Sequence, residues 1–190
     1  EEQGERKEDE VTKPTSKQEE ERDCCPICLE NLPKDTTKFI RWTCCGNGMH
    51  IHCDADLESM KMGDTCPLCR AKTPTTDEEA VQYLRPWVKK KKAWAQYLMG
   101  QHYKDGKGVK QSYEMARILY EQAAQQGDVS AMFNLGDMYR NGLGVEQSYE
   151  RALQYYEQAA HLGHVSAQFN LGLMYEHGTG VTQSYTRAKV

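Results

Sequence analysis

The chain has 190 residues, which is enough for one or two small domains. Its 24 basic and 28 acidic side chains give a formal net charge of -4, which argues against a broad cationic surface for nucleic acid. No apolar run approaches the roughly 20 residues of a membrane-spanning helix, so we expect no membrane partner. Because the sequence starts without methionine and stops inside a repeating pattern, we expect it to be part of a longer product, and a signal peptide upstream stays open.

Residues 1–22 are crowded with charged and glutamine side chains, and Val11 is their only aliphatic residue. Such a segment cannot bury enough apolar surface to offset the entropy lost on ordering. We predict a disordered charged tail, with an acidic interaction arm as the alternative.

Residues 23–73 contain all eight cysteines and two of the six histidines. The cysteines come in close pairs with histidine nearby, which favours metal binding in a reducing compartment over a disulfide scaffold. Eight ligands suffice for two closed tetrahedral zinc sites. The predicted ligands are Cys25, Cys28, Cys44, Cys45, His50, Cys53, Cys66 and Cys69. Cys24 and His52 compete for these roles, but Cys25-x-x-Cys28 and His50-x-x-Cys53 have the spacing of a ligand knuckle.

Little regular structure is expected in this cysteine-rich segment. Short β-prone pieces lie around residues 38–43, and one helix is expected at 54–62. Because so short a fold has a small core, zinc would supply much of its folding free energy.

After a linker at 73–76 the sequence becomes periodic. Gly100, Gly136 and Gly172 are spaced 36 residues apart, and tyrosine and valine columns keep the same register. A fixed period of this length is the signature of a solenoid of helix pairs.

Each 36-residue unit divides into two predicted helices. In the second unit, the first helix ends at Asn141-Gly142, and the second begins near Ser148 and stops before Gly163. Extending the period backwards predicts a lone second helix over 77–92, which would cap the stack and which Pro86 should bend or shorten.

These observations divide the chain into a zinc-stabilised α+β module and an all-α solenoid. The expected parts are a tail at 1–22, the zinc module at 23–73, a linker and capping helix at 74–92, and repeats at 93–128, 129–164 and 165–190, the last one truncated.

The periodic part resembles the Sel-one-like family of tetratricopeptide-related repeats. Leu135-Gly136, Tyr139, the Gly142–Val145 loop and Ala159-Ala160 match the family pattern. The resemblance implies an α-solenoid that serves as an adaptor surface for a protein substrate or other partner, and it implies no catalysis.

The cysteine-rich segment resembles a RING finger, because Cys25-Pro-Ile-Cys28 opens it and Cys66-Pro-Leu-Cys69 closes it. The resemblance implies two interleaved zinc sites. The first would consist of Cys25, Cys28, His50 and Cys53, and the second of Cys44, Cys45, Cys66 and Cys69. Adjacent Cys44 and Cys45 depart from the family, in which at least one residue separates this pair.

The RING resemblance also implies a function, that of a ubiquitin-protein ligase. Ile27, Leu57 and Pro67 match the positions that hold the ubiquitin-conjugating enzyme, although many ligases have tryptophan where Leu57 stands. Arg70 matches the cation that bridges ubiquitin and that enzyme, and it would hold the thioester in a reactive conformer. Transfer would need no covalent intermediate on this chain.

The sequence also allows functions other than that of a ubiquitin ligase. The alternative is a non-catalytic zinc-containing scaffold, and nucleic-acid binding through zinc is the poorest reading because no recognition helix lies between the ligand pairs. Lys89–Lys92 is interpreted as a solvated helix end, with an import signal or an anion-binding patch as alternatives. His161, His164 and His177 lie at helix ends without completing a metal site. The expected location is the cytoplasm, with the nucleus as the alternative.

Overall fold

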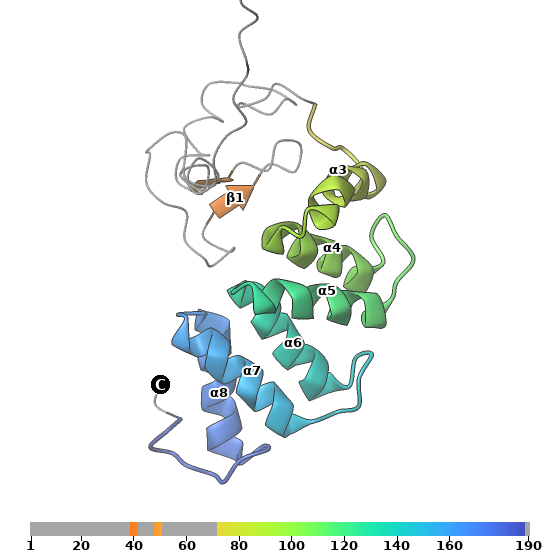
Figure 1. Cartoon of the computed structure of the whole chain (residues 1–190). Helices are drawn as coiled ribbons and strands as arrows, with labels where there is room; N and C mark the ends of the chain where they lie inside the picture. The colour runs from red at the N-terminus through yellow and green to blue at the C-terminus, as the bar shows by residue number, and fades with distance from the viewer. Residues whose placement is uncertain (1–38, 42–47, 51–71, 189–190) are drawn as a thin grey trace, which may run out of the picture.

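The structure is a computed structural model, and it describes residues 39–41, 48–50 and 72–188 (Figure 1). Within these described residues, two short strands are followed by six helices of 13 residues each. The elements are β1 (Phe39–Arg41), β2 (Gly48–His50), α3 (Asp77–Lys89), α4 (Ala93–Asp105), α5 (Tyr113–Gln125), α6 (Val129–Asn141), α7 (Tyr149–His161) and α8 (Val165–His177).

The two strands form an antiparallel hairpin. Phe39 pairs with His50, and Arg41 pairs with Gly48. β1 falls within the β-prone piece expected at 38–43, whereas the helix expected at 54–62 lies outside the described residues.

The helices stack in chain order, each packed against the next, in an all-α solenoid (Figure 1). This confirms the helix-pair interpretation of the 36-residue period. α6 ends at Asn141 and α7 begins at Tyr149, directly after Ser148, as the sequence predicts.

Local chemistry sets the helix ends in every unit. Ser112 caps α5 and Ser148 caps α7, each accepting a hydrogen bond from the backbone N–H three residues later. Gly142 ends α6 with a φ of 68°, a left-handed conformation that glycine adopts without steric cost. Because these signals recur with the repeat, the period of the sequence becomes the period of the fold.

The two helices of a unit approach closely because a glycine faces a tyrosine. A β-carbon at Gly136 would lie 2.6 Å from Cε1 of Tyr156, and one at Gly100 would lie equally close to Tyr120. Both tyrosine side chains are fully buried. Each tyrosine ring therefore fills the space that its glycine leaves.

Helix α3 occupies the place of a second helix from a preceding unit. The loop glycine Gly144 lies against Tyr113 at the start of α5, and Gly108 lies against Asp77 at the start of α3 in the same way. α3 ends at Lys89 rather than at Lys92 as expected. Pro86 lies in its last turn without stopping the helix earlier.

Candidate functional site

The predicted zinc and RING residues lie almost entirely outside the described part of the chain. This holds for Cys25, Ile27, Cys28, Cys44, Cys45, Cys53, Leu57, Cys66, Pro67, Cys69 and Arg70. His50 ends strand β2, and only its backbone is described. The zinc sites and the enzyme-binding surface therefore stay predictions.

No group of three or more potential metal-ligating side chains occurs among the residues that the structure describes. His164 instead has a structural position, because its Nδ1 accepts a hydrogen bond from the backbone N–H of Ala167 at 3.2 Å. Its ring stacks on Phe133 with centroids 4.6 Å apart. His164 thus caps α8, where Asp128 caps α6 one repeat earlier.

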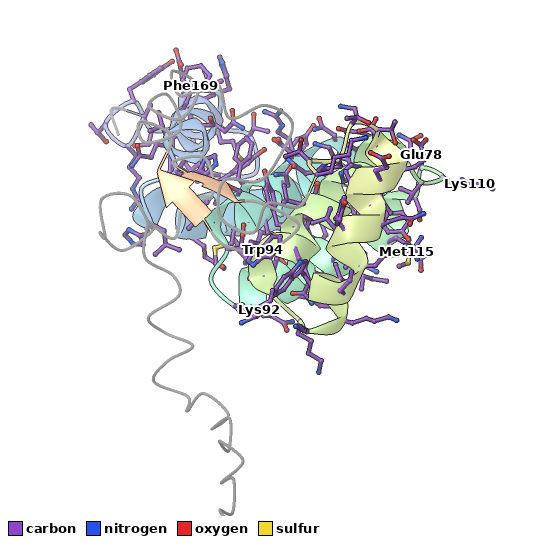
Figure 2. All side chains as sticks on the ribbon, turned by 90° about the horizontal axis from the view of Figure 1, so that it is seen from above. Glu78, Lys92, Trp94, Lys110, Met115 and Phe169 are labelled. Atoms are coloured by element: carbon purple, nitrogen blue, oxygen red, sulfur yellow. The ribbon has the colours of Figure 1, made fainter. Side chains whose placement is uncertain are left out.

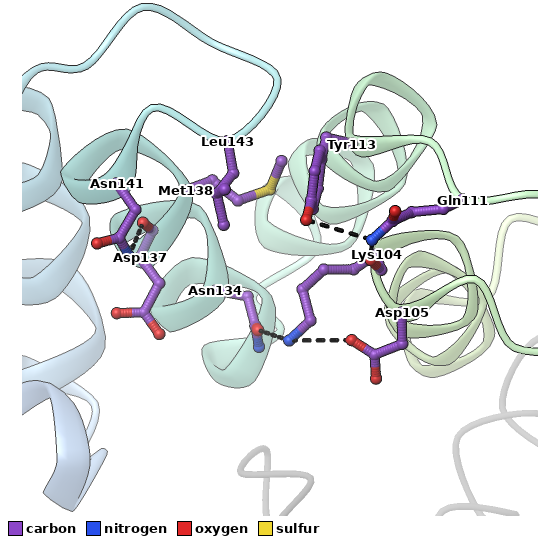
Figure 3. A pocket seen from close by; sticks show the side chains of 9 residues that line it. All are labelled: Lys104, Asp105, Gln111, Tyr113, Asn134, Asp137, Met138, Asn141 and Leu143. Carbon is purple, nitrogen blue, oxygen red and sulfur yellow. Dashed lines mark hydrogen bonds and ion pairs between the residues drawn. The ribbon is translucent and has the colours of Figure 1, made fainter.

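The repeats themselves offer a groove that the sequence analysis did not identify. It has a volume of about 450 Å³ and lies between the end of α4, the start of α5 and the exposed side of α6 (Figure 3). The lining residues are Lys104, Asp105, Gln111, Tyr113, Asn134, Asp137, Met138, Asn141 and Leu143. A volume of this size is within the range of ligand-binding clefts.

The groove carries charges of both signs beside amide groups. The Lys104 ammonium donates a hydrogen bond to Oδ1 of Asn134 at 3.3 Å and lies 3.9 Å from a carboxylate oxygen of Asp105 (Figure 3). Asp137 accepts a hydrogen bond from the hydroxyl of Tyr156 at 2.5 Å and lies 3.5 Å from Arg140. Lys104 and Asp137 therefore each have a neighbour of opposite charge and a hydrogen-bond partner.

A repeated glutamine fixes one wall of the groove. The side-chain amide of Gln111 donates to the carbonyl of Lys104 at 2.8 Å and to the hydroxyl of Tyr113 at 3.2 Å. Gln147 and Gln183 make the same two bonds one and two repeats later. This glutamine therefore ties the loop of each unit to the last turn of its first helix.

The residues specific to this groove are those at which the repeats differ. Asp137 aligns with Gln101 and Leu173 in the neighbouring units, whereas Asn134 aligns with Leu98 in the preceding unit but recurs as Asn170 in the following one. These differences are visible when the repeats are aligned with one another. The sequence alone did not show that the positions face a cleft.

A second cleft of about 460 Å³ lies along α5 and α7. Its wall includes Tyr139 and Tyr155, whose rings stack at 5.6 Å, with the Arg151 guanidinium 5.3 Å from the centroid of the Tyr139 ring. Burial raises the pKa of Tyr155, and the neighbouring Tyr139 adds to this effect. The stacked pair packs α6 against α7 within one unit.

The geometry defines the class of the protein as an α-solenoid built from repeated helix pairs. The Sel1 repeat family model matches residues 95–128, 129–164 and 165–189, which together are half of the chain. The chain therefore belongs to the Sel1 repeat family. No RING or zinc-finger family model matches it.

The solved structures that are similar to the chain include the following two. The first is c5321, a protective antigen of uropathogenic Escherichia coli strains with an SLR fold. Its sequence identity to this chain is 38% and the TM-score is 0.59. The match covers 62% of this chain and 25% of that one. The second is a Sel1 repeat protein from Oxalobacter formigenes, with 33% identity, a TM-score of 0.57, and 59% and 45% coverage. The chain thus spans less than half the length of either, and no curated protein matches it.

No helix in the part of the chain that the structure describes is long and apolar enough to cross a membrane.

Proposed function

We propose that this chain is a protein-interaction scaffold whose Sel1 repeats hold an extended segment of a partner protein in the groove between α4 and α6. The observation that carries this proposal is the groove itself. Its polar side chains have both charge signs and amides, which suit the alternating donors and acceptors of a peptide backbone. The half-buried Leu143 and Tyr113 add apolar surface for the side chains of the bound segment.

A peptide library displayed on phage and selected on the full chain tests this proposal. Selected peptides should bind the double variant Lys104→Ala/Asn141→Ala at least about tenfold more weakly, because both side chains line the groove and neither is fully buried. The matched control is Gln154→Ala/Gln158→Ala in the second cleft. Peptides that bind both variants as tightly as the unmodified chain would show that the groove is not their site.

A RING-type ubiquitin ligase is a second candidate function, and the spacing of the cysteine and histidine ligands favours it. The antiparallel hairpin supports it too. Arg41 pairs with Gly48, so the connection that contains Cys44 and Cys45 begins and ends at neighbouring positions, and His50 ends the same hairpin. In this candidate the eight predicted ligands hold two zinc ions in closed sites, which stabilise the module and leave no position for a reactive water.

The chain's own residues would perform the transfer step by positioning. Ile27, Leu57 and Pro67 would bind the conjugating enzyme, and Arg70 would orient its ubiquitin thioester for attack by a substrate lysine. Autoubiquitination with a panel of conjugating enzymes tests this candidate. The double variant Ile27→Ala/Arg70→Ala should abolish the activity, and unchanged activity in that variant would exclude the proposed surface.

A further inference from the structure

The turn between α3 and α4 is the most basic place in the described chain. It consists of four consecutive exposed lysines, Lys89–Lys92, which we call the lysine turn. From Ala80 to Lys104 the sequence contains no aspartate or glutamate. Figure 2 shows Lys92 near Trp94 at one end of this helix pair, away from Glu78 and Lys110.

Lys91 stands where the other repeats have glycine. Gly127 and Gly163 occupy the equivalent positions of the next two turns, with φ angles of 88° and 86°. Lys91 also has a positive φ, 55°, and it is the only non-glycine residue in the described part of the chain that does. A β-carbon makes this conformation unfavourable, so lysine destabilises this turn relative to glycine.

Lys92 also stabilises its turn less than the equivalent residues of the other repeats do. Asp128 and His164 cap the following first helices through their side chains, at 2.8 Å and 3.2 Å. Lys92 caps α4 without any side-chain hydrogen bond. Its charge also lies at the positive end of the helix dipole, where an anion would be favoured.

The fold gives two of these lysines a role. Lys89 lies in the last turn of α3, where a cation complements the helix dipole. Lys90 lies over the Trp87 ring, with its ammonium 4.7 Å from the centroid. Lys89, Lys91 and Lys92 form no ion pair within residues 72–188. Two consecutive positions thus lose local stability and gain only positive charge, so stability does not account for the lysine turn.

We propose that the lysine turn is a docking surface for an acidic segment of a partner protein, with a run of aspartate or glutamate side chains as the ligand. The lysine turn is separate from the groove, because the turn precedes the first residue of α4, whereas the groove begins at the last residues of α4. The inference therefore does not depend on the function proposed above.

Surface chemistry favours an acidic peptide over an anionic membrane. Within the described residues the exposed large apolar side chains are Met115, Tyr149, Leu162, Val165, Phe169 and Tyr185, and none belongs to the lysine turn. Trp87 is half-buried beneath Lys90. The turn consequently lacks the apolar side chains that would insert among lipids and supplement the charge.

The test uses the full chain and a fluorescent hexaglutamate peptide, with hexaglutamine as the uncharged control probe. The variant Lys91→Gly/Lys92→Asp introduces the residues of the next repeat. The matched control Lys107→Thr/Lys110→Glu changes the net charge equally and also uses residues from equivalent positions. Binding is measured by anisotropy at two salt concentrations, and thermal unfolding is measured for each protein.

Lys91→Gly/Lys92→Asp should weaken hexaglutamate binding at least about tenfold. It should also raise the melting temperature by about 4 °C, since a strained turn and a missing cap are repaired. The control should change the affinity less than about twofold. Equal weakening in both variants would overturn the proposal, because net charge alone would then explain binding. Binding to phosphatidylserine vesicles or to RNA without binding to hexaglutamate would overturn it as well.

Discussion

Tyr120 and Tyr156 occupy the same position in consecutive repeats, but their hydroxyl groups differ in environment. The Tyr156 hydroxyl donates to Asp137, whereas the buried Tyr120 hydroxyl has no partner among the described residues. The residue equivalent to Asp137 is Gln101, whose amide donates to Tyr97 instead. One sequence difference on a neighbouring helix thus decides whether a buried polar group is satisfied.

Replacing each tyrosine by phenylalanine should separate these two situations. Tyr156→Phe should lower the free energy of unfolding by about 1–2 kcal/mol, because it removes a hydrogen bond to a carboxylate. Tyr120→Phe should leave it unchanged or raise it slightly, since an unsatisfied buried hydroxyl is removed. Urea unfolding of both variants measures the difference, and an equal loss of stability in both would contradict it.

The same two side chains predict a loss of stability in alkaline solution. Burial raises the pKa of Tyr120 and of Tyr156 above the ordinary value of 10, and for Tyr156 the hydrogen bond to Asp137 adds to the shift. The unfolded chain then releases these protons at lower pH than the folded chain does. The stabilisation is full below about pH 10 and falls as pH rises further.

The measurement for this prediction is urea unfolding at a series of pH values. The variant that carries both phenylalanine substitutions is the control, and its stability should fall less steeply above pH 10 than that of the unmodified chain. Parallel curves for the two proteins would assign the alkaline transition to other groups.

At the scale of the helix, pairing within a unit depends on the close approach of Gly136 to Tyr156. Gly136→Ala should destabilise the protein by about 1–3 kcal/mol, because its β-carbon would overlap a fully buried ring. In Gly136→Ala/Tyr156→Leu the smaller side chain should relieve this overlap, so that the combined loss is less than the sum of the two single losses. Thermal unfolding of the four proteins measures the coupling, and additive losses would show that the contact is not the cause.

At the scale of the whole molecule, the solenoid has its own core. Three hydrophobic clusters lie within residues 81–188, and α3 closes the first of them with Val81 and Leu84. We therefore expect the stability of the helices not to depend on any metal bound by the cysteine-rich segment.

Removal of zinc tests this independence and the predicted stoichiometry together. Metal analysis of the purified chain should find two zinc ions, as the eight ligands predict. A strong chelator should remove both and leave the thermal unfolding of the helices, followed by circular dichroism, unchanged. One zinc ion per chain would contradict the two-site arrangement, and a melting transition that moves with zinc would contradict an independent solenoid.

Much of the fold was predictable because the residues that shape each unit recur in the sequence at a fixed spacing. Gly136, Ser148 and Gly142 each have one local function, and each recurs at the same spacing. The groove was less predictable, since Lys104 and Asn134 are 30 residues apart and meet only when consecutive units stack.

The sequence by itself determined the helix pairs, their period and their ends, because propensity, capping and glycine conformation act over a few residues. It also predicted eight zinc ligands, since metal ligation requires particular residue types at short spacing. Tertiary structure alone decided which differences between repeats face a cleft, which tyrosine hydroxyl finds a partner, and that Lys91 adopts a conformation suited to glycine. These properties depend on the packing of one unit against the next, which no single stretch of sequence contains.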